Sequence, residues 1–125
     1  MIKSLFHVVA SLLLTSHAAL AEGDVAAGEK VFQRCASCHS ITDTTNKKGP
    51  TLRGIVGRPA ASLGGFEYSE GLKAFGAAGA VWDEATLDKF LQDTYGFVKG
   101  IRMVIPPVRR ETERADLIAF LTSNK

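Results

Sequence analysis

The chain has 125 residues and a formal net charge of +2, from 15 Lys and Arg against 13 Asp and Glu. This length allows one domain and excludes large barrels and doubly wound enzymes, which need roughly 200 residues or more. A composition that is 46% hydrophobic and 22% charged is typical of a folded globular protein, not a disordered one. The small net charge, without a long basic run, excludes nucleic acid as the expected partner.

Residues 1–21 have the pattern of a secretory signal peptide. Lys3 supplies the positive charge, residues 5–14 are almost wholly apolar, and small residues lead up to Ala21. The apolar run is about half of the roughly 20 residues that span a bilayer. We therefore expect cleavage after Ala21, or after Ala18 as the alternative, and export to the periplasm. A retained anchor or a buried N-terminal helix is the competing interpretation.

Residues 22–125 then form the single predicted domain. Apolar side chains at helical spacing predict helices over residues 22–34, 70–75, 83–93 and 111–123. Asp24 and Asp83 are the expected N-caps of the first and third of these helices. The connections over residues 40–65 and 95–108 are rich in turn-forming residues and show no strand periodicity. The predicted fold class is therefore all-α, with long connections.

The first helix is expected to pack closely against another part of the chain. Gly28 inside it costs about 1 kcal/mol relative to Ala, which suggests a close approach at that point. The face expected to pack consists of Val25, Gly28, Val31 and Phe32.

Residues Cys35-Ala36-Ser37-Cys38-His39 form the C-x-x-C-H pattern of c-type haem attachment. Cysteines three apart on a helical turn face one side and can each form a thioether, while His39 can bring a ring nitrogen to the iron. A haem would also supply apolar surface on which the long connections can pack. A thiol redox pair is disfavoured because no βαβ pattern is present. A lone disulfide here would restrain little, and zinc would need four ligands.

The second axial position of the iron has one candidate ligand in the sequence. After the predicted cleavage the chain retains one histidine, His39, and one methionine, Met103, and both cysteines are committed. The second ligand is therefore Met103, or the position is open. Met103 lies among Gly and Pro residues in the segment 99–107, which favours a fixed non-helical loop. The competing interpretation is that Met103 fills a gap in the core.

Segments along the whole domain resemble class I c-type cytochromes. The resemblance is to the mitochondrial-type cytochromes c and their bacterial periplasmic relatives. It implies a small all-α fold in which the N- and C-terminal helices cross and long loops surround one covalently bound haem. The segments that carry it, besides the C-x-x-C-H motif, are residues 28–32, 48–58, 65–69, 81–87, 100–103 and 113–121.

The resemblance implies roles for individual residues. Met103 corresponds to the family's axial methionine, and Pro50 to the proline whose carbonyl accepts the other N–H of the axial histidine. Gly28 corresponds to the glycine where the first and last helices cross near Phe120, and Arg114 resembles the arginine that heads the last helix. The residues expected to bind a buried haem propionate are Arg58, Tyr68 and Trp82. The alternatives are core packing for the two aromatic residues and a surface charge for the arginine.

The sequence departs from the family pattern at several positions. Leu72, Phe90 and Ile101 stand where relatives have an asparagine, a tyrosine and a threonine around the haem. These replacements predict a drier pocket with fewer hydrogen bonds to the ligand and the propionates. Tyr95 and Gly96 occupy positions that are lysines in the mitochondrial proteins, so the surface that faces partners should be less basic there.

The resemblance implies one haem c, attached through Cys35 and Cys38, that serves one-electron transfer. With His39 and Met103 filling both axial positions, the chain is expected to bind no small-molecule substrate and not to be an enzyme. The expected partners are redox proteins of the membrane oxidase, reductase or reaction-centre type, and the chain should be a monomer. The alternatives are a haem sensor or peroxidase-like enzyme with an open axial position, and an electron-entry subunit of a larger complex.

Basic residues flank the two segments that carry the predicted iron ligands. We expect them to form a rim that steers acidic partners, with scattered solvated charges as the alternative. These residues are Arg34, Lys47, Lys48, Lys99, Arg102, Arg109 and Arg110.

Overall fold

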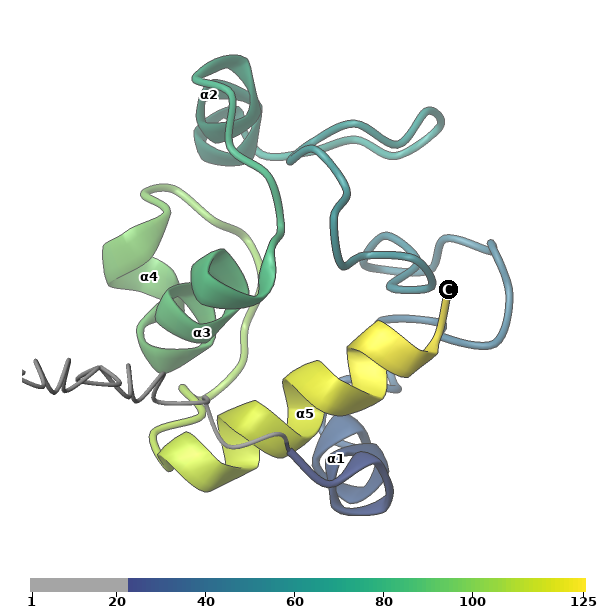
Figure 1. Cartoon of the computed structure of the whole chain (residues 1–125). Helices are drawn as coiled ribbons and strands as arrows, with labels where there is room; N and C mark the ends of the chain where they lie inside the picture. Colours follow the sequence, from purple (N-terminus) through teal and green to yellow (C-terminus); the bar gives the residue numbers. More distant parts are fainter. Residues whose placement is uncertain (1–22) are drawn as a thin grey trace, which may run out of the picture.

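A computed structural model describes residues 23–125, and the predicted signal peptide lies outside this range. Within it the chain forms five helices, and its β pairing is limited to an isolated bridge between Pro59 and Val81. The predicted all-α class is therefore confirmed (Figure 1). The helices are α1 (Val25–Phe32), α2 (Glu70–Ala77), α3 (Glu84–Gln92), α4 (Thr94–Phe97) and α5 (Glu111–Ser123).

Helix α1 begins later than the sequence predicted. The Asp24 carboxylate accepts a hydrogen bond from the Ala27 N–H at 2.8 Å, which caps the helix and makes Val25 its first residue. Gly28 and Phe32 are buried as expected, but Val25 is 45% exposed. The prediction that Val25 shares the buried face is wrong, because the face toward α5 runs through Gly28 and Phe32 and leaves Val25 at its margin.

Helices α1 and α5 cross at a point that only a glycine allows. A Cβ atom at Gly28 would overlap the Asp116 carbonyl and lie 2.8 Å from Phe120 Cβ. The ring centroids of Phe32 and Phe120 are 5.3 Å apart beside this crossing. The Asp24 N–H also donates to the Asp116 carboxylate at 2.7 Å. The predicted crossing of the terminal helices is thus confirmed (Figure 1).

Helices α3 and α4 meet at one residue that serves both. The expected N-cap of α3 is present, since the Asp83 carboxylate accepts from the Thr86 N–H at 2.8 Å. At the other end of α3, Asp93 accepts from the Gly96 N–H at 3.0 Å and thereby starts α4. This short helix lies where the sequence predicted irregular chain.

Helix α2 is held in place by aromatic contacts. It begins after Ser69, whose hydroxyl accepts from the Leu72 N–H at 3.2 Å, and it extends two residues beyond the predicted end, to Ala77. The Phe75 ring lies 5.4 Å from Trp82 and 5.6 Å from Phe97, centroid to centroid. These contacts join α2 to α4 and to the residues before α3.

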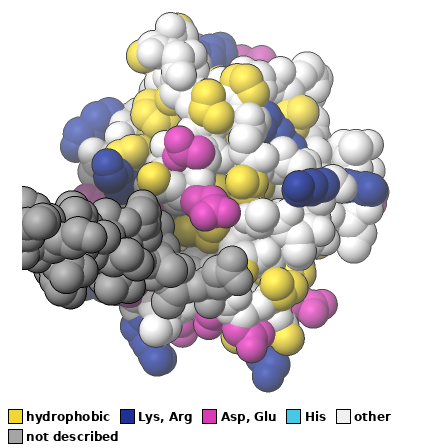
Figure 2. Space-filling model, viewed as in Figure 1, with side chains coloured by type: hydrophobic (Ala, Val, Ile, Leu, Met, Phe, Trp, Pro, Cys, Tyr) yellow, Lys and Arg dark blue, Asp and Glu magenta, His cyan; other side chains and the backbone are white. Residues whose placement is uncertain are grey.

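The elements surround the centre of the molecule. In Figure 1, α2 lies at the top, α3 and α4 at the left, and the α1–α5 crossing below, while the long connection between α1 and α2 closes the right side. On the face shown in Figure 2, Lys and Arg side chains lie at separate points among acidic and hydrophobic ones. Over residues 23–125, no helix combines the length and apolar character needed to cross a membrane.

Candidate functional site

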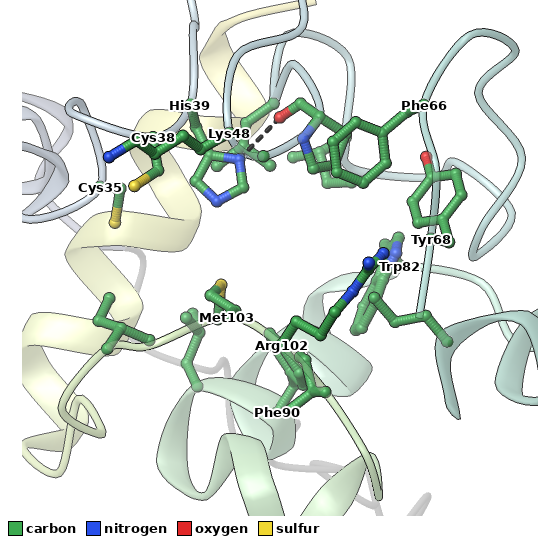
Figure 3. Close-up of a pocket in the computed structure, with 18 of the residues that line it drawn as sticks. Cys35, Cys38, His39, Lys48, Phe66, Tyr68, Trp82, Phe90, Arg102 and Met103 are labelled. Carbon is green, nitrogen blue, oxygen red and sulfur yellow. Dashed lines mark hydrogen bonds between the residues drawn. The ribbon is translucent and has the colours of Figure 1, made fainter. Parts of the chain in front are cut away.

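The centre of the molecule holds a cavity of about 740 Å³ (Figure 3). This volume is within the range of roughly 300–1,000 Å³ that small-molecule and cofactor sites occupy. Apolar side chains from α3, α5 and the long connections form most of its wall. Every site residue predicted from the sequence lines it, namely Cys35, Cys38, His39, Pro50, Arg58, Tyr68, Trp82 and Met103.

The two cysteines lie on one further turn of chain after α1. The Cys35 N–H donates to the Phe32 carbonyl at 2.7 Å, and the His39 N–H donates to the Cys35 carbonyl at 2.9 Å. Both thiols are free and lie together at one end of the cavity (Figure 3). Burial raises the pKa of the Cys35 thiol, although the Arg34 cation acts in the opposite direction. The turn thus presents two thiols and an imidazole to the same space.

The His39 ring is fixed by the next segment of chain. Its Nδ1 lies 2.7 Å from the Pro50 carbonyl oxygen, shown by the dashed line in Figure 3. Because a carbonyl can only accept, Nδ1 carries the proton and Nε2 keeps a free lone pair. A Cβ atom at Gly49 would overlap the ring and lie 2.6 Å from Nδ1, so only a glycine lets the chain pass so close. Gly49 is itself tied to the Cys38 carbonyl by its N–H at 2.8 Å.

The electrostatics around His39 favour its neutral form. Burial lowers the pKa of the imidazole, the hydrogen bond to Pro50 acts in the opposite direction, and the charge of Lys47 lowers the pKa further. The neutral imidazole is the form that binds metal ions. The structure therefore offers Nε2 of His39 to the cavity as a metal ligand.

The opposite wall carries Met103 on an irregular segment. This segment, residues 98–110, is called the methionine loop below. Met103 is partly buried against the core, and its sulfur points into the cavity from the side opposite His39 (Figure 3). Gly100 turns the chain with φ of +72°. The far end of the loop is held by the Val108 N–H, which donates to the Leu91 carbonyl at 2.9 Å.

The end of the cavity across from the cysteines is polar. Tyr68 and Trp82 lie there in Figure 3. The Tyr68 hydroxyl accepts from the Leu63 N–H at 3.3 Å, which leaves its own proton free to donate. The Arg58 guanidinium donates to the Thr51 carbonyl at 2.8 Å, and burial lowers the pKa of this guanidinium. A half-buried cation beside a hydroxyl donor can bind an anionic group such as a carboxylate.

Together these features fit a covalently bound haem. Two thiols lie at one end of an apolar cavity, donors to a carboxylate lie at the other, and a histidine and a methionine face each other across it. The Gly49 backbone passes close to the His39 ring, and the Pro50 carbonyl holds the Nδ1 atom of that ring. The replacements predicted to dry the pocket, Leu72, Phe90 and Ile101, all line the cavity.

The structure also shows contributors that the sequence did not reveal. Gly49 is part of the segment that carried the resemblance, but nothing in the sequence signals its contact with the histidine ring. Arg102 was expected only as a rim charge; it lines the cavity, and its guanidinium donates to the Glu67 carbonyl. Phe66 lines the cavity too, with its ring 4.9 Å from Tyr68.

The predicted basic rim is only partly assembled at the cavity. Arg34, Lys48 and Arg102 line it, whereas the other four basic residues do not. Arg34 also forms an ion pair with Glu113 at 3.1 Å.

Comparison with known proteins agrees with this geometry. The fold is that of a small class I c-type cytochrome. The sequence model of the cytochrome c family matches residues 25–125. The chain is 40% identical over 117 residues to cytochrome c2 from Rhodomicrobium vannielii, covering 93% of this chain and 91% of that protein. It is 41% identical over 110 residues to cytochrome c-554 from Methylosinus trichosporium, covering 87% and 81%.

A solved structure shows the same likeness. Cytochrome c2 from Rhodospirillum centenum superposes with a TM-score of 0.76 at 33% sequence identity, over 82% of this chain and 98% of that one. The chain belongs to the cytochrome c family. This membership indicates an electron carrier and implies one covalently bound haem c, for which Cys35 and Cys38 supply the attachment motif.

Proposed function

We propose that this chain is a one-electron carrier whose haem c is attached through Cys35 and Cys38, with the iron bound by His39 and Met103. The observation that supports this most is the placement of His39 and Met103 on opposite walls of one apolar cavity. When bound, the haem supplies a ferric/ferrous couple that a single electron interconverts. A methionine opposite a histidine favours the ferrous state and raises the reduction potential.

The residues of the chain hold the site in one geometry. Pro50 fixes the tautomer and orientation of His39, so that Nε2 faces the cavity. The apolar wall, to which Phe90 and Leu72 contribute, keeps water away from the metal position. With His39 and Met103 both bound to the iron, no coordination position would be left for a substrate. We therefore propose an electron carrier that is not an enzyme.

We also propose that the protein is exported and exchanges electrons with redox proteins in the periplasm. Residues 1–21 act as a signal peptide that is removed after Ala21, and residues 22–125 work in the periplasm as a monomer. There the protein shuttles electrons between redox proteins of the membrane oxidase, reductase or reaction-centre type. N-terminal sequencing of exported protein tests this directly: a start at Glu22 is expected, and a start at Met1 would contradict it.

The partner surface lies where the methionine loop reaches solvent. Val104, next to Met103, is 91% exposed, and the exposed basic residues Lys48 and Arg102 also line the cavity. An apolar contact bordered by positive charge suits a partner with an acidic docking surface. The rate of oxidation by such a partner should fall as ionic strength rises, and Lys48→Gln should weaken that dependence. A rate that does not change with ionic strength would contradict electrostatic steering.

The covalent attachment and the closed axial site have simple tests. The pigment should stay with the protein in acidified organic solvent, because thioethers hold it. The reduced protein at neutral pH should keep its low-spin spectrum under CO. Ready CO binding would instead favour a haem sensor or a peroxidase-like enzyme, and elution of the native protein at a large size would favour a subunit of a complex.

A further inference from the structure

The methionine loop is poorly fixed by its own hydrogen bonds. Its residues lack regular secondary structure, and three of the five from Lys99 to Met103 are exposed. Such a segment has little intrinsic preference for one conformation. The position of Met103 must therefore be set by the parts of the chain that pack against the loop.

One such contact is a glycine in the first turn of α2. A Cβ atom at Gly71 would overlap the carbonyl oxygen of Lys99 and lie 2.9 Å from its carbonyl carbon. The backbone of α2 thus lies directly on the loop, four residues before Met103. Any side chain at position 71 would force the carbonyl of Lys99 or the helix to move.

A second contact comes from the residue that precedes the methionine. The Arg102 guanidinium donates to the carbonyl of Glu67, just before α2 begins. Glu67 adjoins Tyr68, which is buried at the polar end of the cavity. In Figure 3, Arg102 extends from the methionine side of the cavity toward Tyr68 and Trp82. The arginine therefore ties the loop to a fixed part of the wall.

Helix α2 is itself anchored on the side away from the loop. A Cβ atom at Gly76 would overlap the Ala60 carbonyl oxygen and lie 3.0 Å from its carbon. Phe75 packs against Trp82, at 5.4 Å between ring centroids. The helix thus packs against Ala60 and Trp82 on one side and against the methionine loop on the other. Because α2 is held in place by the first contacts, it can hold the loop in place through the second.

We propose that the start of α2 is a positioning element for Met103, acting through the close contact of Gly71 with Lys99 and the hydrogen bond from Arg102 to Glu67. This inference rests on the proposed axial role of Met103. Loosening either contact frees the methionine from the iron while the histidine side of the site stays intact. Gly71 and Arg102 are positioning residues, because neither is itself a ligand.

The first test compares Gly71 with a glycine at which an added methyl group meets no other atom. Imidazole competes with the methionine for ferric iron, so its affinity for the holoprotein measures how firmly Met103 is held. Gly71→Ala should raise that affinity about tenfold. Gly64→Ala is the control, since it introduces the same methyl group where a Cβ atom meets nothing within 4 Å. Its imidazole affinity should stay within about twofold of wild type.

The second test removes the hydrogen bond and keeps the rest of the side chain. Arg102→Met should raise the affinity for imidazole about fivefold, which is the effect of losing one hydrogen bond. Arg102→Lys keeps a donor, so its affinity for imidazole should lie between those of the wild type and Arg102→Met. Lys73→Met is the control, because Lys73 is a cation that contacts the Glu67 carboxylate at 3.3 Å from α2 itself. If Lys73→Met matches Arg102→Met, the effect is one of charge and the proposal is wrong.

The outcomes separate this inference from the proposed function. If the wild-type protein binds imidazole as tightly as Met103→Ala does, the axial assignment itself fails. If wild type binds weakly and the Gly71 and Arg102 variants behave like wild type, only the positioning role is overturned. Should Gly71→Ala yield no holoprotein, the Arg102 pair decides the question.

Discussion

The two walls of the cavity are built in different ways. On the histidine wall, residues 35–50 follow α1 directly, and neighbours in the sequence fix the ligand: Pro50 bonds the His39 ring and Gly49 passes against it. On the methionine wall, Met103 lies on an irregular loop that is held by Gly71 of α2 and by contacts from α5. One proposed iron ligand is positioned by its own segment, whereas the other also depends on α2, a helix distant in the chain.

This difference predicts where the site is rigid and where it can yield. A local arrangement of turn, proline and glycine survives moderate loosening of the fold, because its contacts close over few residues. An arrangement that depends on the packing of α2 and α5 is lost when those helices shift. The proposed bond between Met103 and the iron should therefore be the first to break under stress, and the proposed bond between His39 and the iron the last.

The largest expected effect comes from adding a methyl group next to the His39 ring. In Gly49→Ala, the added methyl group would overlap a ring that Pro50 already holds, so the chain or the ring must move. We expect the free energy of unfolding of the holoprotein to fall by about 3 kcal/mol and the haem content to drop. Denaturant unfolding and the haem-to-protein ratio measure both. Gly64→Ala is the control, since a Cβ atom there meets nothing within 4 Å.

If Gly49→Ala carries as much haem and unfolds at the same denaturant concentration as Gly64→Ala, the histidine wall is not built on this contact.

A smaller effect is expected from Arg114, which holds the far end of the methionine loop. Its side chain is buried and donates to Asp88 at 2.7 Å and to the carbonyls of Val108 at 3.0 Å and Arg109 at 2.8 Å. Arg114→Met leaves these acceptors without a partner. We expect a loss of about 2 kcal/mol in the free energy of unfolding, with tighter binding of imidazole but unchanged haem content.

Asp88→Asn is the matched control for Arg114. The Asp88 side chain is 43% exposed, so its loss of charge should cost less than about 1 kcal/mol. Equal effects of the two substitutions on imidazole binding would show that the ion pair, and not the bonds to the loop, is what matters.

The smallest expected effect is that of acid pH on the N-cap of α3, the helix that carries Phe90 at the cavity. The Thr86 backbone N–H holds the pKa of the Asp83 carboxyl below its ordinary value of 3.8. Ionised Asp83 therefore stabilises the fold above that pH, and this contribution declines as the pH falls below 3.8 toward the lowered pKa. Stability measured between about pH 5 and pH 2 should fall less steeply in Asp83→Asn. If the free energy of unfolding falls with pH equally steeply in the two proteins, the stabilising role of ionised Asp83 is contradicted.

Local signals predicted much of the fold and of the histidine wall. The apolar spacing from residue 111 to residue 123 predicted α5 over its full length, and the C-x-x-C-H motif needs no tertiary information because its parts are adjacent. Helix α4 was missed because it is a single turn that depends on the Asp93 carboxylate accepting from Gly96. The contacts of Gly71 with Lys99 and of Arg114 with Asp88 join residues far apart in the chain, and no periodicity or motif signals such pairs.

We propose that Met103 completes the ligation of the iron opposite His39. Redox titration of the wild-type protein beside Met103→Ala tests it most directly. The reduction potential should fall in Met103→Ala, because the thioether that favours ferrous iron is gone. Coinciding potentials for the two proteins would contradict it.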